Sequence, residues 1–177
     1  CTAVAYLAHS TNWALKVAGQ AVVELTIGEH DIRTHASILA AMNDSAMDGH
    51  TGYASVPGTP SLRQAVATRI QTRTGVATGP ENILITPGGQ AALFAAHNAV
   101  CDEGDVALYV DPYYATYPGT IRGVGAIPKA IPAYPENGFQ PRVKDLDEHA
   151  KGATSLLINT PNNPTGAVYS IATLDGI

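Results

Sequence analysis

Two short segments combine glycine, proline and polar side chains directly after a predicted strand, and the first of them suits a phosphate group. The first is Thr86-Pro87-Gly88-Gly89-Gln90, in which two glycines separate a predicted strand from a predicted helix. The free amides and positive dipole end of a helix N-terminus stabilise an anion such as phosphate. The alternative is an ordinary glycine turn. The segment is neither a P-loop, which needs Gly-Lys-Ser/Thr, nor a dinucleotide fingerprint, which needs three spaced glycines.

The second segment is the octapeptide Asn-Thr-Pro-Asn-Asn-Pro-Thr-Gly at residues 159–166. Pro164 and Gly166 suit a tight turn that Asn162 or Asn163 can start. A plain β-turn is the alternative interpretation. However, the octapeptide directly follows a predicted buried strand at residues 154–158, so it is the most specific signal in the chain.

The elements that must position these segments alternate between strands and helices. We expect helices over residues 3–18, 36–47, 60–74, 90–101, 113–123 and 143–150, and strands over 22–27, 82–86, 105–110, 126–131 and 154–158. Thr59 is the expected N-cap of the third helix and Gly75 its end. The helix over residues 90–101 is apolar nearly all round, which predicts that it is buried. Pro128 marks an edge or irregular strand.

This alternation predicts an α/β fold with three layers, α/β/α, around a mostly parallel sheet. In such sheets, ligands bind at the carboxyl ends of the strands. Four places meet that rule because each follows a predicted strand: Gly28, residues 87–90, residues 111–114 and residues 159–166.

Composition limits the classes of partner. The chain has 177 residues, 45% of them hydrophobic, and a formal net charge of −5. An acidic chain with scattered arginines does not predict a nucleic-acid partner. No apolar run approaches the length of a membrane span, so no membrane partner is expected. The two cysteines do not form a disulfide framework, and we expect a reducing compartment, the cytoplasm.

Five segments in the same order resemble the class I and II, or fold-type I, pyridoxal-phosphate-dependent aminotransferases. They are residues 27–31, Gly52-Tyr53 with residues 58–63, residues 86–93, residues 111–114 and the octapeptide at 159–166. The resemblance covers roughly residues 22–169. It implies an incomplete large domain of the pyridoxal-phosphate-dependent transferase type over residues 49–177. Residues 1–48 are then an N-terminal arm and a segment of the small domain.

The resemblance assigns cofactor-binding roles to Gly88, Gly89, Gln90, Tyr114, Asn163 and Tyr53. Gly89 and Gln90 match the pair whose backbone amides hold the phosphate of pyridoxal 5'-phosphate. Gln90 replaces the Thr, Lys or Ser often found there, so the resemblance implies a contact through its amide rather than its side chain. Tyr114 matches the aromatic residue that stacks on the pyridine ring, with Tyr113 as its neighbour should the register differ. Asn163 matches the asparagine that bonds the ring hydroxyl oxygen.

The remaining matches concern the substrate and the partner chain. Gly28 matches the glycine that lies against the substrate carboxylate, and Asn163 is expected to border the substrate as well. Tyr53 matches the tyrosine that reaches the neighbouring subunit's cofactor phosphate, which implies a homodimer with shared active sites. Alternatives from the residues alone are a strand-terminal turn for Gly28 and a half-buried loop aromatic for Tyr53.

The function implied is transfer of an amino group between an L-amino acid and a 2-oxo acid. The four lysines, Lys16, Lys129, Lys144 and Lys151, do not lie at a predicted site turn. The lysine that binds the cofactor as a Schiff base is therefore expected beyond Ile177, in a longer chain, and this segment alone is expected to be inactive, with no catalytic residue of its own. A C–S lyase or decarboxylase of the same fold and an aminotransferase-like sensor domain of a transcription regulator are the alternatives.

Other chemically suggestive residues have structural interpretations. His97 is expected to be a satisfied core or interface histidine. His30, His35 and His50 lack metal-ligand spacing, so no metal site is predicted. Asp111 is expected to cap the helix that follows it.

Overall fold

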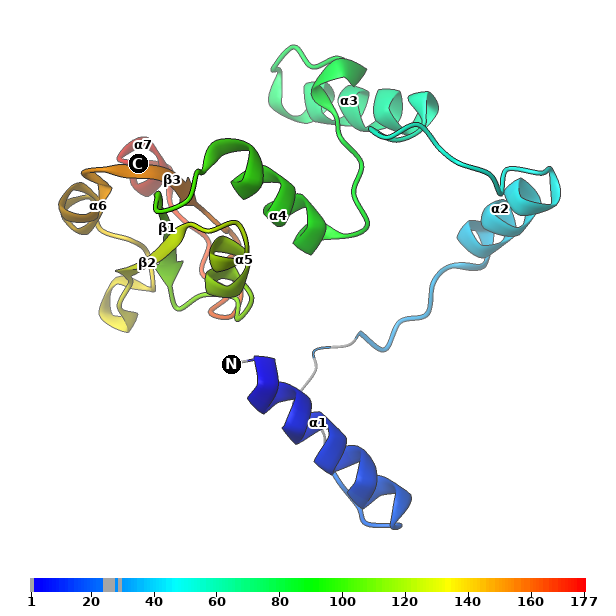
Figure 1. Cartoon of the computed structure of the whole chain (residues 1–177), viewed down its shortest axis with the longest axis horizontal. Helices are drawn as coiled ribbons and strands as arrows, with labels where there is room; N and C mark the ends of the chain where they lie inside the picture. The colour runs from blue at the N-terminus through cyan, green and yellow to red at the C-terminus, as the bar shows by residue number, and fades with distance from the viewer. Residues whose placement is uncertain (1, 24–27, 29) are drawn as a thin grey trace. The chain divides into compact units, whose positions relative to one another are not determined.

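The computed structural model describes residues 2–23, 28 and 30–177, and the chain divides into two compact units, Cys1–Ile85 and Thr86–Ile177. Figure 1 shows the helices of the first unit and the sheet of the second. The predicted strand at residues 22–27 falls largely on residues 24–27, which lie outside the described residues. The boundary expected near residue 48 stays a prediction about the whole protein.

The first unit contains three α-helices, α1 (Thr2–Val17), α2 (Ala36–Met47) and α3 (Pro60–Thr74), and a short 3-10 helix, η1 (Pro80–Asn82). Helix α3 begins with Pro60 in its first turn after Thr59, and ends at Gly75, which is left-handed with φ +73°. These limits agree with the sequence prediction. The Thr59 side chain makes no capping hydrogen bond.

The second unit is built on three parallel strands in the order β2-β1-β3. In chain order its elements are α4 (Gly89–Val100), β1 (Val106–Asp111), α5 (Tyr117–Gly123), β2 (Ile127–Pro132), η2 (Pro135–Asn137), α6 (Val143–Ala150), β3 (Ala153–Leu157) and α7 (Ile171–Asp175). The predicted strands β1, β2 and β3 are confirmed to within one residue, and α6 at both ends.

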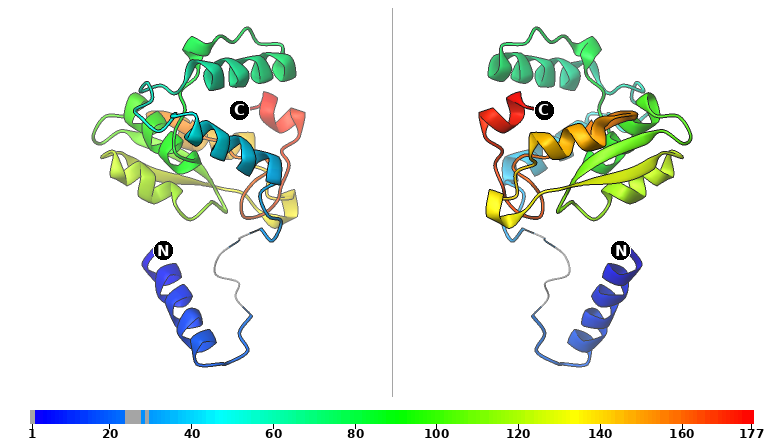
Figure 2. Two further views of the ribbon diagram at one scale, coloured as in Figure 1. Left: turned by 90° about the vertical axis from the view of Figure 1, so that its right-hand side faces the viewer. Right: turned by 90° about the vertical axis from the view of Figure 1, so that its left-hand side faces the viewer.

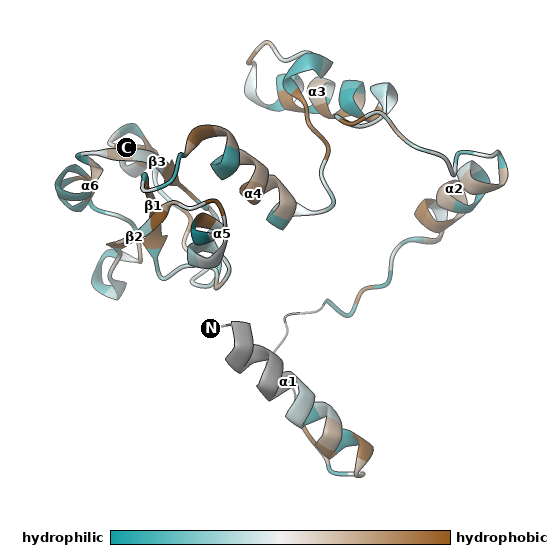
Figure 3. Cartoon of the chain, viewed as in Figure 1, coloured by the Kyte–Doolittle hydropathy of each residue, from teal (hydrophilic) through white to brown (hydrophobic). Residues whose placement is uncertain are grey.

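Helices cover both faces of this sheet, as expected for an α/β/α arrangement (Figure 2). Side chains of β1 alternate between the two faces. Ala107 and Tyr109 pack with Tyr117 and Ile121 of α5, whereas Leu108 packs with Ile131 and Leu146 on the α6 side. The strands are accordingly hydrophobic and α6 is hydrophilic in Figure 3.

Two predicted elements differ from those in the structure. Residues 82–86 do not form a strand: Ile83 is buried and the Ile85 amide donates to the Pro57 carbonyl, but no ladder forms with another described segment. The helix predicted from residue 113 begins only at Tyr117. Pro118 explains the late start, because proline fits the first turn of a helix and not its interior.

Two expected side-chain environments are also wrong. Helix α4 is not buried all round, since within its own unit it packs on α5 and β3 from one side and leaves Phe94 46% and Val100 54% exposed. Asp111 does not cap α5, because the N-cap position is Thr116, five residues further on. The backbone carbonyl of Asp111 instead accepts a hydrogen bond from Ala133.

Candidate functional site

The N-terminus of α4 offers unpaired backbone amides. Its N-cap is Gly88, with φ 84° and ψ 166°, a conformation that glycine adopts without strain. A glycine N-cap has no side chain with which to satisfy the first amides of the helix. Within the described chain, the amides of Gly89 and Gln90 donate to no acceptor. These donors and the helix dipole together favour an anion, by about 0.3–1 kcal/mol for the dipole at an exposed site.

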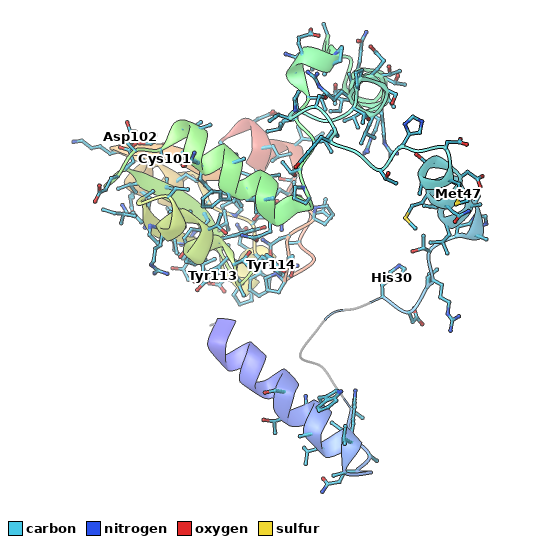
Figure 4. The ribbon with its side chains drawn as sticks, turned by 45° about the vertical axis from the view of Figure 1, so that its right-hand side comes forward. His30, Met47, Cys101, Asp102, Tyr113 and Tyr114 are labelled. Atoms are coloured by element: carbon cyan, nitrogen blue, oxygen red, sulfur yellow. The ribbon has the colours of Figure 1, made fainter. Side chains whose placement is uncertain are left out.

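Tyr114 lies in the turn between β1 and α5. Figure 4 shows Tyr113 and Tyr114 near the carboxyl end of β1, whereas Cys101 and Asp102 lie near its amino end. The Tyr114 ring is 43% exposed and meets the Tyr117 ring edge to face, with the centroids 5.8 Å apart. Tyr113 instead packs on Tyr109, with centroids 4.8 Å apart. Of Tyr113, Tyr114 and Tyr117, Tyr114 is therefore the one exposed enough to pack against a ligand.

The octapeptide at residues 159–166 follows β3 at the same end of the sheet. The buried side chain of Asn162 starts the turn, because its Oδ1 accepts hydrogen bonds from the Thr165 amide at 3.2 Å and the Thr165 hydroxyl at 2.9 Å. Gly166 completes the turn with φ 74°. Asn163 is exposed, and its side-chain amide makes no hydrogen bond to another described residue. It is free to bind a ligand.

One cavity of about 670 Å³ brings these groups together. It is lined by Gly89, Gln90, Ala92, Leu93, Ala96, Tyr114, Tyr117, Asn159 and Asn163, all within the second unit. Four predicted cofactor-binding residues, Gly89, Gln90, Tyr114 and Asn163, thus border one space. Gly88 precedes the lining as the N-cap. The parallel strands explain this convergence, because their carboxyl ends meet at one edge of the sheet.

Five lining residues were not assigned to the site by the sequence analysis, and two of them, Tyr117 and Asn159, carry polar side-chain groups. With the Asn159 side-chain amide oriented to satisfy its neighbours, its oxygen accepts hydrogen bonds from the Tyr117 hydroxyl at 3.1 Å and from the backbone amide of Asn163 at 2.9 Å. Burial raises the pKa of Tyr117. Asn159 belongs to the octapeptide, so its position was a signal. No sequence pattern pointed to Tyr117, because its role depends on Asn159, which lies 42 residues away in the sequence.

The structure does not test the predicted contacts of Gly28 and Tyr53. Both residues belong to the first unit, and the Tyr53 side chain is fully exposed there. His97 is buried, and desolvation lowers its pKa, as expected of a core histidine. Among the described residues there is no group of three or more His, Cys, Asp or Glu that could hold a metal ion.

The cavity residues fit pyridoxal 5'-phosphate. The backbone amides at the N-terminus of α4 have no acceptor and can donate hydrogen bonds to its phosphate. The Tyr114 ring can pack on its pyridine ring, and the side-chain amide of Asn163 can donate a hydrogen bond to its ring oxygen. The space is within the range of about 300–1,000 Å³ typical of small-molecule sites. No described helix combines the length and hydrophobicity needed to cross a membrane.

Comparison with known proteins identifies the class. The family model for aminotransferase class I and II matches residues 20–177, and this chain belongs to that family. It is 37% identical over 156 residues to a probable aspartate/prephenate aminotransferase of Thermus aquaticus, covering 88% of this chain and 41% of that protein. It is 32% identical over 160 residues to the arginine–pyruvate transaminase AruH of Pseudomonas aeruginosa, covering 90% of this chain and 41% of that protein.

Solved structures show the same relationship. An aspartate aminotransferase from Thermus thermophilus, determined with maleate, matches with a TM-score of 0.91 and 32% identity over 97% of this chain and 45% of that one. An alanine aminotransferase from Pyrococcus furiosus matches with a TM-score of 0.91 and 28% identity over 98% of this chain and 45% of that one. The chain therefore spans about two fifths of the length of the relatives it matches, which confirms the resemblance to the N-terminal portion of the family.

Proposed function

We propose that the whole protein is an aminotransferase that uses pyridoxal 5'-phosphate, and that this chain supplies part of the surface that binds the cofactor. The observation that carries the proposal is the single cavity bordered by Gly89, Gln90, Tyr114 and Asn163. The relatives compared above are all named as aminotransferases or transaminases. That agreement favours amino transfer over a lyase, a decarboxylase or a sensor domain.

Four of the residues that border the cavity have a part in the proposed binding. The amides of Gly89 and Gln90 hold the phosphate at the N-terminus of α4. The Tyr114 ring packs on one face of the pyridine ring and excludes water from it. The Asn163 side chain donates a hydrogen bond to the ring oxygen, which favours the charged form of that oxygen. When bound, the cofactor supplies the carbonyl carbon that takes up the amino group and a ring that acts as an electron sink.

The proposal extends to substrates, partner and compartment. An L-amino acid and a 2-oxo acid are the substrates, with Gly28 and Asn163 near the substrate carboxylate. A homodimer places Tyr53 at the neighbouring subunit's cofactor phosphate, which gives its fully exposed ring a function. Cys101 is a buried free thiol, which agrees with a reducing compartment, so we place the protein in the cytoplasm.

Enzyme assays of the whole protein test this function. Purified protein loaded with pyridoxal 5'-phosphate is mixed with aspartate, arginine or alanine as donor and pyruvate or prephenate as acceptor, the substrates that occur in the relatives' names. We expect transfer of the amino group for at least one pair. Release of ammonia without appearance of a new amino acid would instead indicate a lyase, and release of carbon dioxide with formation of an amine would indicate a decarboxylase.

A further inference from the structure

We infer that the side chain of Gln90 is a positioning residue, which braces the N-terminus of α4 against α5. The brace sets the spacing between the amides that bind phosphate and the ring of Tyr114. This inference rests on the proposed function, because it concerns how the same cavity recognises a ligand that has both a phosphate and an aromatic ring.

The carboxamide of Gln90 uses both its donor and its acceptor. Its Nε2 donates a hydrogen bond to Thr120 Oγ1, and its Oε1 accepts one of 2.7 Å from Thr116 Oγ1. The Thr120 hydroxyl in turn donates to the backbone carbonyl of Thr116 at 3.0 Å. These three bonds form a closed set in which every hydroxyl hydrogen is used. A carboxylate lacks the donor and an alkyl side chain lacks both groups, so the arrangement fits an amide.

The far end of the brace is a rigid anchor. Thr120 is only 6% exposed and lies one helical turn after Thr116 on α5. A neighbouring bond ties Tyr114 to the same helix, because its carbonyl accepts a hydrogen bond of 3.0 Å from the Tyr117 amide. The Tyr114 ring also contacts the Tyr117 ring. Gln90 and Tyr114 are therefore both held relative to α5, although one comes from α4 and the other from the loop after β1.

This geometry predicts a difference between two ligands. Inorganic phosphate needs only the amides of Gly89 and Gln90, which belong to the backbone of α4. Pyridoxal 5'-phosphate must meet those amides and the Tyr114 ring at the same time. Loosening the brace should therefore weaken binding of the cofactor much more than binding of phosphate, because only the cofactor depends on the distance between the two groups.

The test uses the whole protein, freed of cofactor, with the variants Gln90→Ala and Thr116→Val. Dissociation constants for pyridoxal 5'-phosphate and for inorganic phosphate are measured by calorimetry. We expect cofactor binding about 3- to 10-fold weaker in either variant, as for loss of one or two hydrogen bonds, and phosphate binding changed by less than about twofold. The double variant should be no weaker than Gln90→Ala alone, since both changes break one network.

Asn98→Ala is the matched control, because Asn98 is an exposed amide on the same helix with no hydrogen bond in the described structure. Its affinities should equal those of the wild type. Unchanged cofactor binding in both Gln90→Ala and Thr116→Val would overturn the inference, and so would equal weakening for phosphate and cofactor. A wild-type protein that does not bind the cofactor would overturn the proposed function itself, an outcome distinct from these two.

Discussion

The hydroxyl of Tyr117 and the side-chain oxygen of Asn159 lie 3.1 Å apart and join two elements that are distant in sequence. Tyr117 opens α5, and Asn159 follows β3. The same Asn159 oxygen also accepts a hydrogen bond from the backbone amide of Asn163 at 2.9 Å. The bond from Tyr117 therefore holds Asn159 at the start of the turn that carries Asn163. A buried tyrosine hydroxyl thereby helps to place a predicted ligand group.

The Tyr117→Phe variant should therefore be less stable than the wild type. It removes one buried hydrogen bond and leaves the ring, so we expect the free energy of unfolding to fall by about 1 kcal/mol. Urea denaturation of the whole protein measures the change. An unchanged free energy of unfolding in Tyr117→Phe would contradict this role of the hydroxyl.

Two adjacent glycines should respond differently to alanine. Gly88 has φ 84°, whereas Gly89 lies within α4, and a Cβ on either residue would meet no atom within 4 Å. Gly88→Ala should thus destabilise the protein by about 1–3 kcal/mol through backbone strain alone, because its φ and ψ lie in a region that essentially only glycine adopts. Gly89→Ala should not destabilise it, because Gly89 is the first residue of α4 and alanine is favoured over glycine in a helix. Thermal unfolding of both variants without cofactor checks this, and equal losses would contradict it.

Asn163→Ala should change the titration of the bound cofactor. A hydrogen bond donated to the ring oxygen stabilises its charged form and lowers its pKa. Without that donor, the pKa read from the absorption spectrum of the bound cofactor should rise. Asn98→Ala serves as the control. A spectrum that titrates identically in Asn163→Ala and wild type would show that the side chain does not reach the ring oxygen.

Stability should fall at mildly acidic pH because of His97. Burial lowers its pKa in the folded state from the ordinary value of 6.5. The unfolded chain therefore takes up a proton at a higher pH than the folded protein does. As pH falls below 6.5, this protonation stabilises the unfolded chain relative to the folded state. The stability associated with neutral His97 is complete above pH 6.5 and is lost as pH falls through the folded-state pKa. Denaturation midpoints measured across this range should be less dependent on pH in His97→Gln.

Local sequence patterns predicted much of this fold. Helix α6 and the three strands followed from hydrophobic periodicity and from glycine and proline signals, and the glycine-rich turn and the octapeptide marked the two segments that border the cavity. These features depend on residues close together in sequence, for which propensity and turn chemistry are informative.

Those local patterns do not predict which residues pack together when they lie far apart in the sequence. Residues 82–86 have the composition of a strand, but a strand forms only where a neighbour pairs with it. Helix α4 is apolar nearly all round, but how much of its surface is buried depends on which other elements pack against it. The two bonds from Gln90 to α5 and the bond from Tyr117 to Asn159 likewise join residues 26 or more positions apart.

The central claim is that one cavity binds pyridoxal 5'-phosphate through groups from three separate segments. A crystal structure of the whole protein with this cofactor measures that most directly. We expect the phosphate at the amides of Gly89 and Gln90, the ring against Tyr114 and the ring oxygen at Asn163. A cofactor bound elsewhere, or a phosphate held away from the N-terminus of α4, would contradict the account.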